Sequence, residues 1–312
     1  MWAGAFIRMR PLTMPVTLIP GIRERVARIQ TTPAIPMVLQ PLLKMLATPA
    51  EDVDVNEIVR LISYDNTIAA QCLRVASSPL FGLAQPPRSI AAAVVILGLR
   101  RVESILLTCC MGQAFPGRKS GLDPTVFWKH SLGCAMVCRK LSEKLARADR
   151  EKAYVAGLLH DIGFLVNSLV IPNEFAAATA KAAREQIPLH LAELEMMGFT
   201  HCETGQALAQ QWSLAPEIAN VIAFHHSVEE CPEPRPLVAL VHLSDLMCRM
   251  RGLDYGYYET QSVDLLTDPA WDILCQEHKE LADVDLELFT FELDDAVGQI
   301  SEIVATVFGR AA

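Results

Sequence analysis

The chain has 312 residues and a net charge of −9, and 51% of its residues are hydrophobic. This length allows one large domain or two modest ones, and the acidic balance argues against general binding to a phosphate backbone. No apolar run reaches 18 residues, so we expect no membrane span. Nine cysteines without a CxxC pair, and no signal-peptide pattern, favour free thiols in a reducing cytoplasm.

Helical periodicity recurs along the chain, whereas strand signals are scarce, so we expect an all-α fold. In the first third, Asp54 with Glu57 has the capping-box pattern of a helix start. The breaker QPPRS at residues 85–89 precedes a helix that begins near Ile90, and Gly98 divides that helix from the next one.

A polar break at residues 116–124 predicts a boundary between two subdomains. Beyond it, helix starts are expected at Pro124, at Thr200 with Glu203, at Pro216 and at Pro236. Gly163 is typical of a helix end, and the tail from residue 286 to residue 307 predicts one or two more helices.

Candidate ligands for a metal ion all lie beyond this break, in apolar helical surroundings. They are His130, His160, Asp161, His201, His225, His226 and Asp245. The pair His160-Asp161 ends an apolar stripe, where a buried carboxylate needs a partner, and imidazole with carboxylate is a common ligand set for divalent ions. His225 falls on the core face of its helix, with His226 about 100° further round.

Each candidate also has a plain structural interpretation. His160 and Asp161 could cap a helix end, and His130 and His225 could be core histidines bonded to backbone carbonyls. His201 could be exposed at the start of its helix, and Asp245 could pair with a buried arginine. These alternatives stay open at the level of single residues.

The combined pattern resembles the HD superfamily of metal-dependent phosphohydrolases: His130, then His160-Asp161, then Asp245. The added His201 and the tandem His225-His226 resemble its HD-GYP branch. Short motifs narrow the resemblance to the HDOD family over roughly residues 29–250. These motifs are PAIP (33–36), ISYD (62–65), ASSP (76–79), ILGLR (96–100), FWKHS (127–131) and GFTH (198–201).

The resemblance implies a multi-helix HD-like bundle with an N-terminal helical subdomain, in a bacterial signalling protein. It divides the chain into an N-terminal extension (1–28), the N-terminal helical half of the HDOD domain (29–118), an HD-like metal-binding half (119–252) and a C-terminal helical extension (253–312). It also implies one or two metal ions, with iron favoured over manganese, nickel or zinc, and Asp161 as the bridging carboxylate.

The sequence departs from its relatives in informative ways. Many HDOD members lack a complete ligand set, but all seven candidates are present here. Ser77-Ser78 replaces the usual Asn-Ser, and no Gly-Tyr-Pro follows His226. Val126 stands where some HD-GYP members place a glutamate, which favours at most two ions rather than three.

Three functions are compatible with these observations. The first is a non-catalytic regulatory module that keeps its metal and passes a signal to a separate protein. The second is a metal-dependent phosphohydrolase acting on a nucleotide, a cyclic nucleotide or another phosphorylated ligand. The third is a DNA-binding regulator that uses residues 90–107; Gly98, Arg100 and Arg101 favour it, and net charge opposes it. If the protein works by binding a partner protein, Arg100 and Arg101 are candidate residues at the edge of the binding surface.

Overall fold

The structure, a computed structural model, describes residues 38–48, 52–63, 65–114, 122–145, 148–255 and 264–308. Within these ranges the chain is helical and contains no strand, which confirms the all-α prediction. The α-helices are α2 (Leu39–Ala47), α3 (Val55–Ser63), α4 (Asn66–Ala76), α5 (Ile90–Leu97), α6 (Leu99–Ala114), α7 (Pro124–Ser142), α8 (Arg150–Leu159), α9 (Ile162–Val170), α10 (Pro172–Glu185), α11 (Leu189–Met197), α12 (His201–Gln211), α13 (Pro216–Phe224), α14 (Pro236–Met250), α15 (Pro269–Glu277) and α16 (Leu286–Val307).

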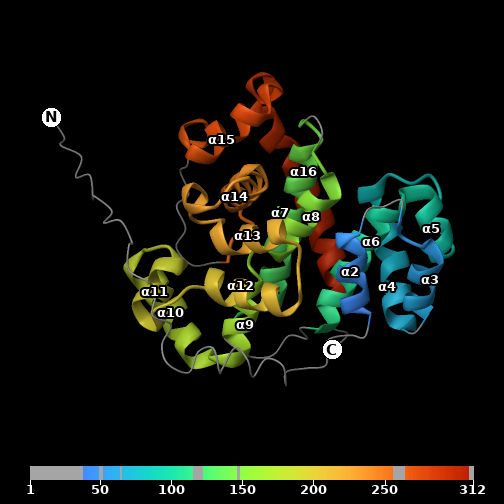
Figure 1. Ribbon diagram of the computed structural model, residues 1–312, viewed down its shortest axis with the longest axis horizontal. Coiled ribbons are helices and arrows are strands. Elements are labelled where there is room, and N and C mark those ends of the chain that lie inside the picture. Colours follow the sequence, from blue (N-terminus) through green and yellow to red (C-terminus); the bar gives the residue numbers. More distant parts are fainter. Residues whose placement is uncertain are drawn as a thin grey trace.

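The helices form two groups joined by a central set. Helices α2 to α6 lie together on one side, and α9 to α15 lie on the other (Figure 1). Between them, α8 packs against both α6 and α7, and α16 packs against both α4 and α7. Residues 1–28, and residues 116–121 of the boundary predicted at 116–124, fall outside the described residues.

Most helix starts follow the sequence signals. The carboxylate of Asp123 accepts hydrogen bonds from the backbone N–H groups of Thr125 and Val126, so α7 begins at Pro124. Thr200 and Glu203 form a complete capping box at α12. Proline occupies the first turn of α13 and of α14, as predicted.

The prediction for Gly163 was wrong. The helix ends earlier, at Leu159, and Gly163 lies in the first turn of α9. A Cβ atom at Gly163 would overlap the backbone carbonyl of His201, and one at Gly205 would lie 2.6 Å from Cγ2 of Ile222. Glycine is therefore needed because α9 and α12 pack backbone against backbone, which brings the start of α12 close to Asp161.

One described stretch, Arg150–Val170, has the length and hydropathy of a membrane span. It comprises α8, the break at His160-Asp161 and α9, and 89% of its most apolar window is buried inside the fold. This burial is typical of the core of a soluble domain. The stretch thus carries the His-Asp pair through the middle of the molecule.

Candidate metal centre

Asp161 lies at the break between α8 and α9, and its side chain is fully buried. The carboxylate sits between two groups of histidines that come from different helices. Oδ2 faces one group, and Oδ1 faces the other. This single side chain therefore divides the site into two halves.

The first subsite consists of His130, His160 and Asp245 together with Oδ2 of Asp161. Nε2 of His160 lies 3.0 Å from Oδ2, and Nε2 of His130 lies 3.7 Å from it. Oδ1 of Asp245 is 3.1 Å from Nε2 of His130, and the two imidazole Nε2 atoms are 3.4 Å apart. Helices α7 and α14 and the end of α8 thus contribute to one cluster of possible ligand atoms.

The second subsite consists of His201 and His225 together with Oδ1 of Asp161. Their Nε2 atoms lie 3.2 Å and 3.1 Å from Oδ1, and 3.4 Å from each other. His201 opens α12, and His225 follows the last residue of α13. Both side chains are buried, so His201 is not the exposed histidine of the plain structural interpretation, whereas the burial of His225 agrees with its own.

The far nitrogen of each imidazole is held by an oxygen atom. In three histidines Nδ1 donates to a backbone carbonyl. The pairs are His130 with Leu253 (2.5 Å), His160 with Gly157 (2.8 Å) and His225 with Val221 (3.1 Å). Nδ1 of His201 donates to the carboxylate of Glu193 (2.6 Å). Because these oxygens only accept hydrogen bonds, they place a proton on Nδ1, which is the arrangement found behind metal-bound histidines.

This arrangement turns the unprotonated Nε2 atoms of four neutral imidazoles toward the carboxylate oxygens. The lone pairs of the nitrogens would then face those of the carboxylate oxygens at 3.0–3.7 Å, and this arrangement requires a proton or a metal cation between the two atoms. Among the residues that the structure describes, no hydrogen bond reaches Oδ1 of Asp161, although two imidazole nitrogens lie close to it. The set of donor atoms, together with this oxygen that has no hydrogen bond, fits divalent metal ions.

Without a metal, the site compensates by binding protons. Burial opposes a charge on His130, but the hydrogen bond and charge of Asp245 raise its pKa to about 9. Burial also opposes a charge on His225, but the Cys202 thiolate and the Asp161 carboxylate raise its pKa to about 10. Burial would raise the pKa of Asp161, yet the neighbouring imidazoles, His160 first, hold it well below its usual range.

Asp245 has two kinds of partner. Its carboxylate accepts a hydrogen bond from Nε of Arg249 (2.8 Å) and also faces Nε2 of His130. An arginine partner, as in the plain interpretation, is therefore present beside the histidine, although Arg249 is partly exposed rather than buried. Arg249, on the same helix α14, balances the negative charge of Asp245, and the Oδ1 atom of Asp245 still borders the first subsite.

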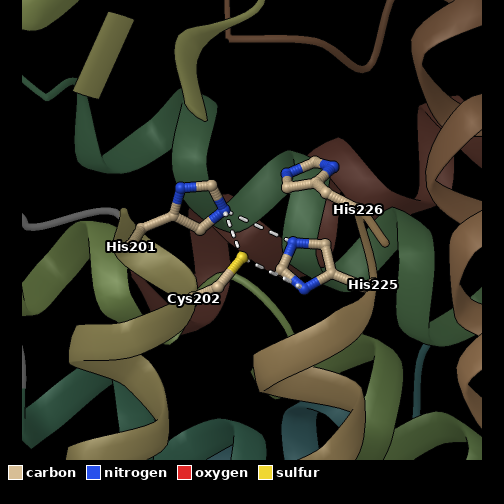
Figure 2. Close-up of side chains that lie close together, drawn as sticks. All are labelled: His201, Cys202, His225 and His226. Carbon is tan, nitrogen blue, oxygen red and sulfur yellow. Dashed lines mark hydrogen bonds between the residues drawn. The ribbon is translucent and has the colours of Figure 1, made fainter. Parts of the chain in front are cut away.

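His226 lies at the edge of the second subsite. Its ring stacks on that of His190, with the centroids 4.5 Å apart, and it is more exposed than His225. Ligand atoms of His226, His201, His225 and Cys202 all lie within 4.8 Å of one another (Figure 2). In the described contacts His226 does not reach Asp161, so it is the most peripheral of the seven candidates.

Three residues of the site were missed by sequence reasoning. Glu193 orients His201, Tyr255 donates a hydrogen bond to Oδ2 of Asp161 (2.6 Å), and Nδ1 of His242 donates to the carbonyl of His225 (2.6 Å). Glu193 could have been found, because Leu189, Ala192, Glu193 and Met197 share one helix face and all are buried. Tyr255 gave no such signal, since it lies in a polar segment after α14.

Arg100 and Arg101 are tied into the fold. Arg100 donates hydrogen bonds to the carbonyls of Met45 (3.1 Å) and Thr48 and to the buried carboxylate of Glu103 (2.9 Å). Arg101 lies 3.6 Å from a carboxylate oxygen of Glu151. Both side chains are partly exposed, so a role in partner binding stays a prediction. Arg100 also lines a pocket between α2, α8 and the start of α13.

The fold and the site together define a class of protein. An all-helical bundle that surrounds a buried His-Asp pair with histidines from other helices is typical of the HD superfamily. The family model described as "HDOD domain" matches residues 32–228, which is more than half of the chain. The protein therefore belongs to the HDOD family; Asp245 lies beyond the matched residues.

The relatives agree with this assignment. An uncharacterised protein of Treponema pallidum (strain Nichols) is 28% identical over 224 residues, which cover 71% of this chain and 43% of that protein. The chain thus spans less than half of this relative's length. A crystal structure of an HDOD domain protein with unknown function from Geobacter sulfurreducens has a TM-score of 0.77 at 29% identity, covering 92% of this chain and 98% of the other. A Shewanella amazonensis SB2B protein, provisionally assigned as a phosphohydrolase, shares the fold at 23% identity with a TM-score of 0.70, covering 91% of this chain and 97% of the other.

Proposed function

We propose that this chain is a regulatory HDOD module that retains a dinuclear metal centre bridged by Asp161. One observation carries the proposal: four imidazole Nε2 atoms surround the two oxygens of one buried carboxylate, and each imidazole is held from behind through Nδ1. One metal would bind His130, His160 and Asp245, and the other would bind His201 and His225. When bound, such ions supply Lewis-acid chemistry and can activate a shared water.

Burial supports regulation over turnover. Every residue of the two subsites is between 0% and 1% exposed. Catalytic metal sites keep an open position for water and substrate, whereas structural sites are closed by protein ligands. The candidate ligands are buried, and Tyr255 adds a hydroxyl against Asp161, so the metal ions would hold a conformation of the helices around them.

The ligand chemistry limits the metal. Imidazole and carboxylate donors suit iron, manganese, nickel and zinc. They disfavour calcium, which prefers ligands that are all oxygen atoms. We favour iron. All nine cysteines are free and eight are buried, which supports the cytoplasm as the compartment. The partner in this proposal is a separate signalling protein.

A metal-dependent phosphohydrolase acting on a nucleotide or cyclic nucleotide is the second candidate. The observation that favours it is the bridging position of Asp161, because paired ions around a shared carboxylate clamp phosphate in two-metal hydrolases. A panel of phosphomonoesters and phosphodiesters tests it with the metal-loaded protein. We expect no turnover of cyclic dimeric GMP, because no Gly-Tyr-Pro follows His226; turnover in the usual range of about 1–1000 per second would reverse the order of the two candidates.

Metal analysis tests the proposal itself. The protein should be purified without chelator, reloaded with ferrous or manganous ion under reducing conditions, and measured by elemental analysis. We expect up to two ions per chain in the wild type, loss of metal in Asp161→Asn, and retention in Asp272→Asn, an exposed carboxylate in α15. A wild-type protein that stays metal-free after reloading would contradict the metal centre.

A further inference from the structure

Cys202 follows His201 on α12, and its thiol faces the second subsite. The residue is 8% exposed. Its Sγ atom lies 3.6 Å from Nε2 of His201 and 4.0 Å from Nδ1 of His225. Figure 2 shows the sulfur between the two imidazole rings. No function has yet been given to this thiol.

The distance from Cys202 to His201 matches that between two ligands of one tetrahedral ion. A nitrogen at about 2.05 Å and a sulfur at about 2.3 Å from such an ion stand about 3.5 Å apart, and two nitrogens stand about 3.3 Å apart. The Sγ atom is 3.6 Å from Nε2 of His201, and the Nε2 atoms of His201 and His225 are 3.4 Å apart. Oδ1 of Asp161 lies 3.1–3.2 Å from the same two nitrogens, and the ligand atoms of Cys202, His201 and His225 all lie within 4.8 Å of one another.

Charge gives a second, independent reason. The first subsite has an anionic ligand of its own, Asp245, in addition to the shared Asp161. The second subsite has two neutral imidazoles and only its share of Asp161. Glu193 is bonded to Nδ1 of His201, which points away from the metal position. Within the described residues, Cys202 is therefore the side chain that can give this subsite a negatively charged ligand not shared with the first subsite.

We propose that Cys202 is a thiolate ligand of the second subsite, so that the two metal positions differ: nitrogen and oxygen donors in the first, with a sulfur donor added in the second. The inference rests on the proposed metal centre. Sulfur selects softer ions, so the second position should prefer zinc, iron or cobalt over manganese or magnesium. The two positions could then hold different metals.

Cys134 provides a matched comparison. Its Sγ atom lies 3.4 Å from Nε2 of His130, about as close to the first subsite as Cys202 is to the second. The first subsite already has two carboxylate oxygens, from Asp161 and Asp245. We therefore assign Cys134 to packing, and expect the two cysteines to behave differently.

Cobalt absorption tests the assignment, because a cobalt–thiolate bond gives an intense charge-transfer band in the near ultraviolet. The full chain should be loaded with Co²⁺ and compared with Cys202→Ser, Cys202→Asp, Cys134→Ser and His226→Ala. We expect the band in the wild type and Cys134→Ser, and its loss in both Cys202 variants; His226→Ala measures whether this neighbouring imidazole also contributes to the site. Cys202→Ser should also bind the second ion at least about tenfold more weakly, whereas Cys202→Asp should retain it through oxygen.

The outcomes separate two failures. If the wild type binds no cobalt, the metal centre itself is wrong. If the wild type binds cobalt without the band, or if the band survives in Cys202→Ser or disappears in Cys134→Ser, the assignment of Cys202 is wrong. Should Cys202→Ser fail to fold, X-ray absorption of the wild-type cobalt protein decides, through the presence or absence of a sulfur neighbour at about 2.3 Å.

Discussion

Glu193 positions His201 by two contacts, although it offers no atom to either metal position. Its Oε2 atom accepts hydrogen bonds from Nδ1 (2.6 Å) and from the backbone N–H of His201 (2.9 Å). Replacement of such outer partners usually costs about 10–100-fold in metal affinity. We expect Glu193→Ala to weaken the second metal by this amount and Glu193→Gln to weaken it less, because the amide oxygen can still accept one bond.

Metal titration by calorimetry or by a competing chelator measures this effect. Glu195→Ala is the control, since this neighbour on α11 is 59% exposed and pairs only at the surface with Lys181. Equal affinities in the wild type and Glu193→Ala would show that His201 is held by packing alone.

Protonation of the histidines predicts a pH dependence of metal binding. In the metal-free fold the pKa values of His130 and His225 are raised to about 9 and about 10, from an ordinary value of 6.5. Their charged forms stabilise the metal-free fold fully below about pH 6.5, and this contribution is lost as pH rises through 9–10. A metal ion must displace these protons, so its apparent affinity should rise from about pH 6.5 to about pH 9.

Calorimetric titrations in buffers of different ionisation enthalpy count the protons released on metal binding at neutral pH. The gap in melting temperature between loaded and metal-free protein should widen over the same pH range. Release of no proton would mean that the imidazoles are already neutral in the metal-free protein.

At the scale of single helices, Gly163 and Gly205 set the distance between α9 and α12. A Cβ atom at Gly163 would meet the backbone of His201, which cannot rotate away as a side chain could. We expect Gly163→Ala to lower the free energy of unfolding by about 1–3 kcal/mol, as overpacking does, and to displace His201 from Asp161. Urea denaturation and metal content together measure both effects.

Gly298→Ala is the matched control on α16. A Cβ atom there has no neighbour within 4 Å, so the change should raise stability by about 0.5–1 kcal/mol through helix propensity. If both alanine variants were equally stable, the close approach of α9 and α12 would not be a constraint on the fold.

The helices themselves were largely predictable, because their starts are encoded locally. Asp123-Pro124, the Thr200–Glu203 capping box, Pro216 and Pro236 all mark observed starts. The predicted end of α8 was wrong because Gly163 was interpreted from the preference of glycine for helix ends. Its role is instead the close contact with His201 at the start of α12, almost 40 residues away in sequence. Candidate ligands were recognisable by residue type, but which oxygen of Asp161 faces which histidine depends on tertiary packing alone.

Across the whole molecule, Arg100 links two helices of the N-terminal group. It reaches from α6 to the carbonyls at the end of α2 and neutralises Glu103, which is fully buried. Removing one partner of a buried ion pair usually costs about 3–5 kcal/mol, and the partial exposure of Arg100 should bring this toward the lower end. We therefore expect Arg100→Glu to destabilise the protein by about 3 kcal/mol, contrary to the expectation for a surface residue.

Urea denaturation compares this variant with Arg60→Glu, whose side chain is 70% exposed and which should change stability by less than about 0.5 kcal/mol. An Arg100→Glu protein as stable as the wild type would return Arg100 to the set of candidate partner-binding residues. Arg100→Glu is thus unsuitable as a simple probe of partner binding unless its stability is measured first.

The carbonyl of Leu253 holds His130, although 123 residues separate them, and Asp245 comes from the helix just before that carbonyl. During synthesis on the ribosome, the first subsite therefore stays incomplete until the chain has grown past α14. All residues of the second subsite have been synthesised once the chain has grown past His225. The order of the chain therefore fixes the order in which the two subsites can become complete: the second first, and the first only when α14 and Leu253 have been made.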